Sequence, residues 1–246
     1  MFRYQILIEY DGSKYSGWQS QKNSKSIQSE IQKVISKITK ENILIYGSGR
    51  TDAGVHAINQ SAHFDTKKKI INLFKFISSI NHFLIPKKVS IKKIINKNKK
   101  FHARYSAKKR EYKYIVLNRN FPSVLYENKA WHIRSKLDLA SMKKAAKKLI
   151  GKHNFNAFRS SNCNAKSPIR TINNIKIIKN EDRIIFLFQS QAFLKNQVRS
   201  MVGCLKLIGE KKWKIHNLVK VINSKNRNFC APPAPAQGLY LSKVFY

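Results

Sequence analysis

The sequence predicts an α+β fold made of two structurally related halves that join near residues 101–110. Short apolar segments of strand length are interspersed with longer segments whose apolar residues recur every three or four positions. The two halves repeat a similar order of such segments without sharing sequence. A chain of 246 residues is also long enough for each half to bury its own core. We therefore expect one domain over residues 1–105 and a second over residues 106–246.

The first half predicts the order strand, helix, strand, strand, helix, strand. Residues 2–10 have the pattern of a strand and stop at Asp11-Gly12, a turn pair. Ser26 is a suitable N-cap for a helix whose apolar stripe is spaced by three and four residues. The stripe consists of Ile27, Ile31, Val34, Ile35 and Ile38. The remaining predicted elements are strands over 43–46, 60–65 and 89–96 and a helix over 73–84.

The second half begins with a predicted strand from Lys109 that carries Tyr112, Tyr114 and Val116 on one face. A helix follows with the apolar stripe Leu139, Met142, Ala146 and Leu149, and Gly151 is expected to end it. After these come strands over 172–178 and 184–189, helices over 194–208 and 215–222, a Pro-rich loop over 231–235 and a strand over 239–245.

The chain is strongly basic. Its 49 Lys and Arg against 12 Asp and Glu give a formal charge of +37, while 42% hydrophobic residues are too many for a disordered basic tail. A field this positive suits nucleic acid, an acidic substrate or an acidic phospholipid. No stretch approaches the ~18 apolar residues of a membrane span, and the N-terminus does not resemble a signal peptide. We therefore expect a soluble cytoplasmic protein.

The cysteines and histidines indicate neither a metal site nor a disulfide framework. Cys163, Cys204 and Cys230 are odd in number and contain no Cys-x-x-Cys pair. The seven histidines never fall at a metal-binding helix spacing. We expect reduced thiols and no bound metal.

One Gly-rich segment, residues 47–56, has the character of a site. The dinucleotide pattern G-x-G-x-x-G would need a glycine where Asp52 stands. The Walker pattern matches Gly49 and Gly54, but Val55-His56 replaces its Lys-Ser/Thr pair. Neither a nicotinamide cofactor nor ATP is therefore implied.

What remains in this segment is a carboxylate, Asp52, with Arg50 two residues earlier and glycines on both sides. Glycines allow the backbone to turn sharply and a bulky ligand to approach closely. Two interpretations are open. Asp52 either bonds the amides of its own loop, as aspartates in turns often do, or performs chemistry. An acid that faces RNA would repel phosphate, so its presence there would need a chemical reason.

The segment from Gly49 to His56 resembles the signature of the tRNA pseudouridine synthase A family. Further blocks resemble that family in the same order and span almost the whole chain: residues 9–12, 15–19, 101–107, 112–114, 198–203 and 234–241. Two departures stand out, Lys195-Asn196-Gln197 where many members have His and Met, and an additional Pro-rich Ala231-Pro232-Pro233. The resemblance implies the pseudouridine synthase fold, in which largely antiparallel sheets join into one central sheet with helices packed on it.

The resemblance also implies four site residues. Asp52 is then the catalytic nucleophile, and Arg50 helps to extrude the target nucleotide. Tyr112 stacks on the uracil, and Arg199 pairs with the aspartate. The residue pattern alone would make Tyr112 a core aromatic and Arg199 a charge flanking a helix.

The implied activity is the isomerisation of uridine to pseudouridine at positions 38, 39 and 40 of the tRNA anticodon stem-loop, with no cofactor. The family works as a homodimer with tRNA lying across both subunits. Two alternatives remain open at this point. In the first alternative, which composition alone favours, the chain is a non-catalytic basic RNA-binding or ribosome-associated protein. In the second, it is an isomerase of the same kind that acts on another RNA.

Overall fold

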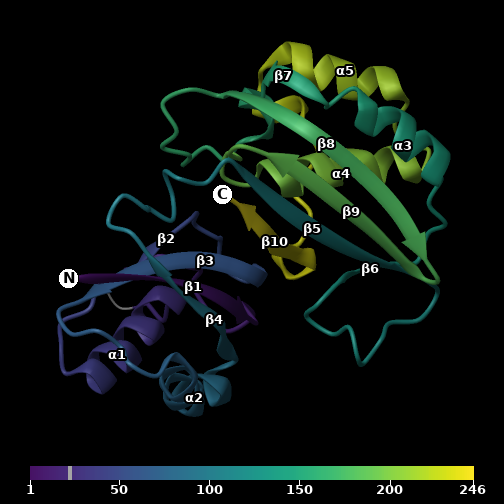
Figure 1. Cartoon of the computed structure of the whole chain (residues 1–246). Coiled ribbons are helices and arrows are strands. Elements are labelled where there is room, and N and C mark those ends of the chain that lie inside the picture. Colours follow the sequence, from purple (N-terminus) through teal and green to yellow (C-terminus); the bar gives the residue numbers. More distant parts are fainter. Residues whose placement is uncertain (22–23) are drawn as a thin grey trace. The chain divides into compact units, whose positions relative to one another are not determined.

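The computed structural model describes residues 1–21 and 24–246, which form two compact units (Figure 1). Unit 1 comprises residues 1–108 and 240–246, and unit 2 comprises residues 109–239. Each unit combines helices with mainly antiparallel strands. The predicted α+β class is therefore confirmed.

Unit 1 is a sheet with the strand order β4-β1-β3-β10, and β2 also pairs with β3. β1 is antiparallel to β3 and β4, whereas β10 is parallel to β3. The two helices α1 and α2 contact each other on one face of this sheet (Figure 1). The elements are β1 (Phe2–Tyr10), α1 (Ile27–Thr39), β2 (Tyr46–Gly47), β3 (His56–Thr66), α2 (Leu73–Leu84), β4 (Val89–Lys97) and β10 (Leu239–Phe245).

The N-terminus of α1 is fixed by the predicted cap. The Ser26 hydroxyl oxygen accepts a hydrogen bond from the Ser29 amide at 3.1 Å, which satisfies one of the amides that a helix start leaves without a partner. Most of the predicted apolar stripe is buried, with Ile27, Ile31 and Ile35 at 0% exposure. This burial holds α1 against the core of unit 1.

The predicted strand over 43–46 is wrong except at its end, because only Tyr46–Gly47 pairs with β3. Side chains of α1 take the place of a strand partner. The Ile43 amide donates to the Ser36 hydroxyl at 3.0 Å, and the Ile45 amide donates to Gln32 Oε1 at 3.2 Å. Ile43 and Ile45 are therefore buried in a segment that is anchored to a helix.

Unit 2 is a sheet with the order β5-β9-β8-β7, and β6 runs parallel to β5 at its edge. α3 contacts β8, α4 and α5, which places a helical layer against the sheet (Figure 1). Phe186 and Phe188 of β9 and Met201 of α4 are fully buried in the core. The elements are β5 (Lys109–Asn118), β6 (Trp131–Ile133), α3 (Leu139–Lys147), β7 (Gly151–Asn154), β8 (Ile169–Asn180), β9 (Arg183–Ser190), α4 (Gln197–Gly209) and α5 (Ile215–Ser224).

The sequence predicted that Gly151 ends the preceding helix, but this residue instead begins β7 with a φ of +108°. α3 already ends at Lys147. The next amides bond carbonyls three residues back, with Leu149 donating to Ala146 at 3.1 Å and Ile150 donating to Lys147 at 3.3 Å. This tighter turn still buries Leu149 completely. The short strands β6 and β7 were not predicted.

A buried histidine couples unit 1 to pH. His63 of β3 is 2% exposed, and its Nδ1 accepts a hydrogen bond from the Ala103 amide at 3.1 Å. Burial, together with the charges of Arg3 and His102, lowers the pKa of His63 from 6.5 to about 4, although the nearby Asp65 acts in the opposite direction. The folded chain therefore keeps this ring neutral at pH values where the unfolded chain protonates it.

Unit 1 is expected to lose stability as the pH falls from about 6.5 to about 4. In this window His63 is protonated in the unfolded state but neutral in the folded state. Across the whole window this difference should lower the free energy of unfolding by about 3 kcal/mol. Denaturant titrations across that range measure the effect. His63→Asn keeps an acceptor for the Ala103 amide and should flatten the pH dependence, and an unchanged slope in this variant would contradict the assignment.

Candidate active site

The Gly-rich loop, residues 47–56, is anchored to β3 at its start. The Ser48 amide donates to the Ser61 carbonyl at 2.7 Å, and the Ser48 hydroxyl donates to Gln60 Oε1 at 2.8 Å. The Gln60 side-chain amide donates in turn to the Gly49 carbonyl at 2.9 Å, and Gln60 is completely buried. The first three residues of the loop are therefore fixed by a buried network.

The middle of the loop is clamped by the end of β1 and by the segment that follows this strand. The Trp18 amide donates to the Thr51 carbonyl at 3.0 Å, and the Tyr10 and Thr51 hydroxyls are 2.8 Å apart. Gly17 has a φ of +106°, and a Cβ atom there would lie 2.5 Å from the Thr51 carbonyl oxygen. Only glycine therefore allows this close approach. We call these contacts the Thr51 clamp.

Asp52 directly follows the clamped residue and is half-buried. Its carbonyl accepts a hydrogen bond from the Val55 amide at 3.2 Å, and Gly54, with a φ of +75°, donates its amide to the Tyr15 carbonyl at 3.3 Å. The backbone is thus held on both sides of the carboxylate. Arg50 is exposed, and its Nε donates to Gln19 Oε1 at 3.1 Å.

His56 links the end of the loop to two other segments of unit 1. Its Nδ1 accepts a hydrogen bond from the Gly12 amide at 3.0 Å and lies 3.2 Å from Asp11 Oδ1. Its ring stacks on Tyr240 of β10 with 4.7 Å between ring centroids. The predicted turn pair and the C-terminal strand therefore both position this loop.

The other two predicted site residues belong to unit 2. Tyr112 lies on β5, is half-buried, and meets the ring of Phe193 edge-on at 5.2 Å. Arg199 lies in the first turn of α4 and is half-buried. The structure thus brings Asp52 and Arg50 into one loop of unit 1 and places Tyr112 and Arg199 on elements of unit 2.

Arg199 is held by the Pro-rich loop near the C-terminus. Its Nε donates to the Ala234 carbonyl at 2.6 Å, and the Ala234 amide donates to the Arg199 carbonyl at 3.0 Å. The hydroxyl of Tyr114 donates to the next carbonyl, Pro235, at 2.8 Å. Burial raises the pKa of Tyr114, which Arg199 lowers in part, so this hydroxyl stays a donor at neutral pH. Two successive carbonyls are thereby fixed from β5 and α4.

The departure at Lys195-Asn196-Gln197 has a structural role of its own. Asn196 takes the left-handed conformation, with a φ of 64°, just before α4, and its Oδ1 accepts a hydrogen bond from Arg199 at 3.1 Å. Gln197 Oε1 accepts a bond from the Leu194 amide at 2.8 Å. These residues therefore shape the start of α4 and help to orient Arg199.

Sequence reasoning missed the residues that hold the site together. Four of them contact the Asp52 loop or the Pro-rich loop that holds Arg199: Tyr10, Trp18, Gln60 and Tyr114. The fifth, His56, ends the Asp52 loop and bonds the Gly12 amide. Most of them fall inside the family-like blocks, which was the available signal. Except for Gly49, the partner of Gln60, their partners lie tens of residues away in the chain and could not be predicted from spacing.

Within residues 1–21 and 24–246, no group of three or more His, Cys, Asp or Glu is arranged to hold a metal ion. The cysteines are free thiols, with 3.6 Å between the sulfurs of Cys204 and Cys230. No helix in these ranges is long and apolar enough to cross a bilayer.

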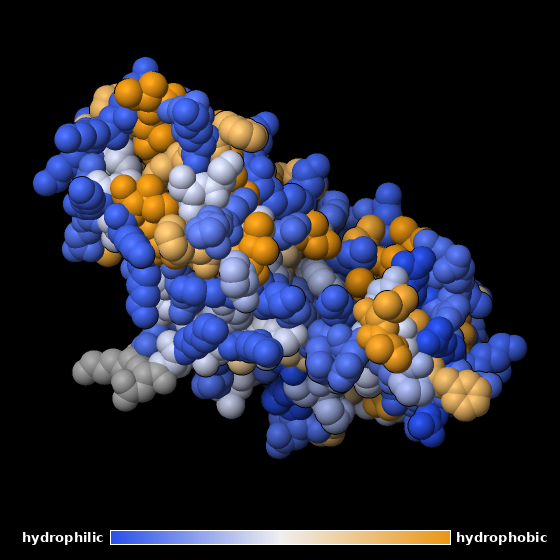
Figure 2. Space-filling view, turned by 90° about the horizontal axis from the view of Figure 1, so that it is seen from below, coloured by the Kyte–Doolittle hydropathy of each residue, from blue (hydrophilic) through white to orange (hydrophobic). Residues whose placement is uncertain are grey.

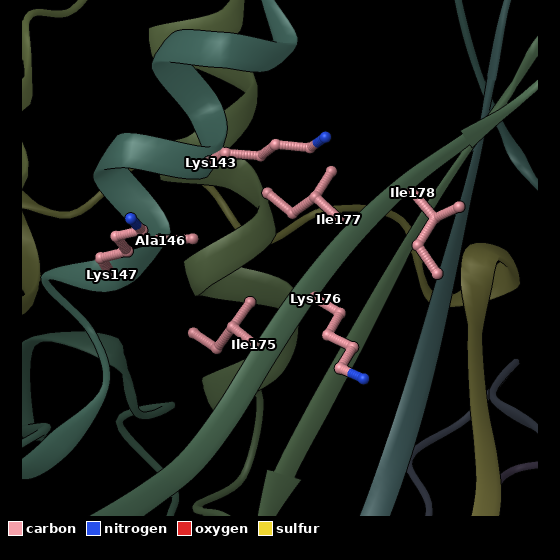
Figure 3. Close-up of a pocket in the computed structure, with 7 residues that line it drawn as sticks. All are labelled: Lys143, Ala146, Lys147, Ile175, Lys176, Ile177 and Ile178. Atoms are coloured by element: carbon pink, nitrogen blue, oxygen red, sulfur yellow. The ribbon is translucent and has the colours of Figure 1, made fainter.

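A shallow groove of about 310 Å³ lies in unit 2 between α3 and β8 (Figure 3). Ile175 and Ile177 point from the strand toward the helix, and Lys143 and Lys147 stand on the helix side. None of the four predicted site residues lines it, and its lining of isoleucines, one alanine and lysines contains no carboxylate. The groove therefore adds nothing to the candidate site.

Comparison with known proteins identifies the family. The family model for tRNA pseudouridine synthase matches residues 6–106 and 145–246. A tRNA pseudouridine synthase A from Pelagibacter ubique (strain HTCC1062) is 55% identical over 246 residues, which covers 100% of both chains. The protein of the same name from Neorickettsia sennetsu (strain ATCC VR-367 / Miyayama) is 39% identical over 244 residues, 99% of this chain and 100% of that one.

Among solved structures, a chain of a Cbf5-Nop10-Gar1 complex aligns with a TM-score of 0.34 and 11% identity. The alignment covers 82% of this chain and 54% of that chain. The family assignment rests instead on the sequence matches, which extend over most of the chain and include the loop of Asp52 and the helix of Arg199. By these matches the chain belongs to the tRNA pseudouridine synthase family, whose members are isomerases.

Proposed function

We propose that this tRNA pseudouridine synthase isomerises uridines 38, 39 and 40 of the anticodon stem-loop, with Asp52 as the nucleophile. The observation that carries the proposal is the Thr51 clamp, which fixes the backbone beside the carboxylate within the family-like motif. The two relatives described above bear the name tRNA pseudouridine synthase A, which supports the same substrate for this chain.

The reaction needs little besides a nucleophile and a closed pocket. The bond between C1′ of the ribose and N1 of uracil breaks, and a bond between C1′ and C5 forms. C5 loses its proton and N1 gains one, so the atoms balance. No electrons are gained or lost, and no co-reactant is needed. A fixed carboxylate can hold the intermediate while the detached ring turns, since positioning supplies much of the rate in such steps.

The target uridine must leave its stem before it can react. Flipping a paired nucleotide out of a helix costs a few kcal/mol. Arg50, exposed in the same loop as Asp52, is proposed to occupy or contact the vacated position, and Tyr112 is proposed to stack on the uracil. Arg199 is proposed to favour the ionised carboxylate, which an opposite charge stabilises. The hydrogen bonds of Arg199 to Ala234 and Asn196 give its guanidinium a fixed direction.

The basic surface is proposed to bind the tRNA backbone. Of the 49 basic residues 38 are lysines and 11 are arginines, and Figure 2 shows one face on which hydrophilic residues predominate between separate apolar patches. Phosphate contacts of this kind position an RNA without reading its sequence. We further propose that the enzyme acts in the cytoplasm as a homodimer.

Removal of the Asp52 carboxylate should abolish catalysis. In Asp52→Asn, tritium release from C5 of labelled uridine in unmodified tRNA should fall by at least about 10³-fold, because the nucleophile is lost. Asp182→Asn is a suitable control, since Asp182 is a partly exposed acid paired with Arg119 at 3.2 Å. Undiminished release by Asp52→Asn would disprove the nucleophile assignment and favour a different reaction centre.

The three target positions can be tested singly. Transcripts that retain uridine at only position 38, 39 or 40 should each release tritium, while a transcript that lacks all three should release none. Mapping of pseudouridine by primer extension after carbodiimide treatment gives an independent readout. Modification of the transcript without these uridines would show that the chain acts on another site or another RNA.

The ring of Tyr112 should matter more than its hydroxyl. A base stacked on an aromatic ring contributes ~1–3 kcal/mol, which corresponds to about a 5- to 150-fold change in rate. Tyr112→Ala should therefore lower the single-turnover rate by that factor, whereas Tyr112→Phe should keep most of the wild-type rate. Phe121→Ala, which removes a 78% exposed ring of the same unit, is the control. If Tyr112→Phe is as slow as Tyr112→Ala, the hydroxyl assists the reaction and the stacking role is wrong.

A further inference from the structure

Unit 1 carries a second cluster of aromatic side chains, formed by Tyr46, His63, His102 and Tyr105, which we call the aromatic run. Tyr46 stacks on His63 with 5.2 Å between ring centroids and an interplanar angle of 23°. His63 meets His102 edge-on at 4.7 Å, and His102 lies against Tyr105 at 4.4 Å. Four rings from three separate segments of the chain are therefore in continuous contact.

The run is buried in its middle and open at both ends. His63 is 2% exposed, whereas Tyr46 is 48% exposed and Tyr105 is 77% exposed. A ring as exposed as Tyr105 contributes little to the core, because the gain from an apolar side chain scales with the area removed from water. The stability of unit 1 therefore gives no reason for an aromatic side chain at this position.

Hydrogen bonds hold the run in place. The Ala103 amide donates to His63 Nδ1 at 3.1 Å, and the Arg104 and Tyr105 amides donate to His102 Nδ1 at 3.1 and 3.3 Å. The segment that carries Tyr105 is thus tied to a buried ring. A ring fixed in advance loses little conformational entropy when a ligand covers it.

The charges around the run favour an anionic partner. Burial and neighbouring arginines lower the pKa of both His63 and His102, so these rings are neutral at pH 7. The guanidinium of Arg104 lies 5.6 Å from the Tyr105 ring centre, and Lys99 and Lys100 are exposed nearby in the chain. The acid of this region, Asp65, is already paired with Arg3 through hydrogen bonds of 2.7 and 2.8 Å. Uncharged ring faces are therefore set among cations.

From this combination we infer that Tyr46 and Tyr105 stack on unpaired bases of the tRNA substrate, while Arg104 and the neighbouring lysines contact the adjacent phosphates. Surfaces that bind single-stranded nucleic acid combine aromatic platforms with a positive groove in this way. The inference rests on the proposed function only in taking tRNA as the ligand. It adds a binding surface made of residues other than the four proposed site residues.

Equilibrium binding of unmodified tRNA to the full-length enzyme tests the inference. Tyr105→Ala and Tyr46→Ala should each raise the Kd by about 5- to 150-fold, whereas Tyr105→Phe should stay near the wild type. Phe74→Ala is the matched control, because Phe74 is a ring of unit 1 that is 79% exposed and lies on α2. Thermal unfolding of each variant checks that the fold is kept.

The salt dependence of Kd separates stacking from charge. The slope of log Kd against log salt reports phosphate contacts, so the tyrosine variants should shift the line without changing its slope. Lys100→Ala should reduce the slope instead, because the inferred complex pairs this lysine with a phosphate. A changed slope in Tyr105→Ala would mean that the residue acts through neighbouring charges and would overturn the stacking assignment.

Three further outcomes decide the matter. An unchanged Kd in both tyrosine-to-alanine variants, or an equal loss in Tyr105→Phe, would refute the inference. A loss of oligomeric state in these variants, measured by sedimentation, would assign the surface to a second copy of the chain. The proposed function is tested separately, because Tyr105→Ala should still release tritium at saturating tRNA while Asp52→Asn should bind tRNA normally and release none.

Discussion

The Thr51 clamp is the constraint on which the candidate site depends. The carbonyl of this residue is held by the Trp18 amide and its hydroxyl by Tyr10, so the peptide that leads into Asp52 has little freedom. A loop with glycines would otherwise sample many conformations, and an aspartate in it would spend most of its time misplaced. Because misplacement by about 1 Å can cost about two orders of magnitude in rate, the proposed reaction depends on the clamp as well as on the carboxylate.

In unit 2 the Pro-rich loop that holds Arg199 is likewise fixed by hydrogen bonds. The carbonyls of Ala234 and Pro235 accept hydrogen bonds from Arg199 of α4 and Tyr114 of β5, so the Pro-rich loop is tied to two rigid elements. Arg199 thereby acquires a structural task in addition to its proposed role. This dual use explains why residue pattern alone favoured a charge flanking a helix, since the guanidinium does serve the local fold.

The long periodic elements could be predicted because their causes are local. The cap at Ser26 and the stripe after it specify α1 within fifteen residues, and the alternation of β1 is equally short in range. The segment around Ile43 and Ile45 could not be predicted, since its amides bond side chains of α1 rather than another strand. The same limit applies to the site. Asp52 is visible in its motif, whereas Tyr10 contacts Thr51 from a position that no spacing rule indicates.

The charge of +37 can attract an RNA but cannot orient one. Phosphate contacts act over long distances and let the protein slide along the RNA backbone. They therefore do not determine which nucleotide reaches the candidate site. Orientation must come from groups with directional or planar contacts. The groups proposed to orient the RNA in this chain are the clamped Asp52 loop, the anchored Arg199 and the rings of the aromatic run, whose histidines stay neutral because burial and nearby arginines lower their pKa. Long-range attraction and orientation are therefore assigned to different sets of residues, so a substitution of a surface lysine should leave the stacking contacts measurable.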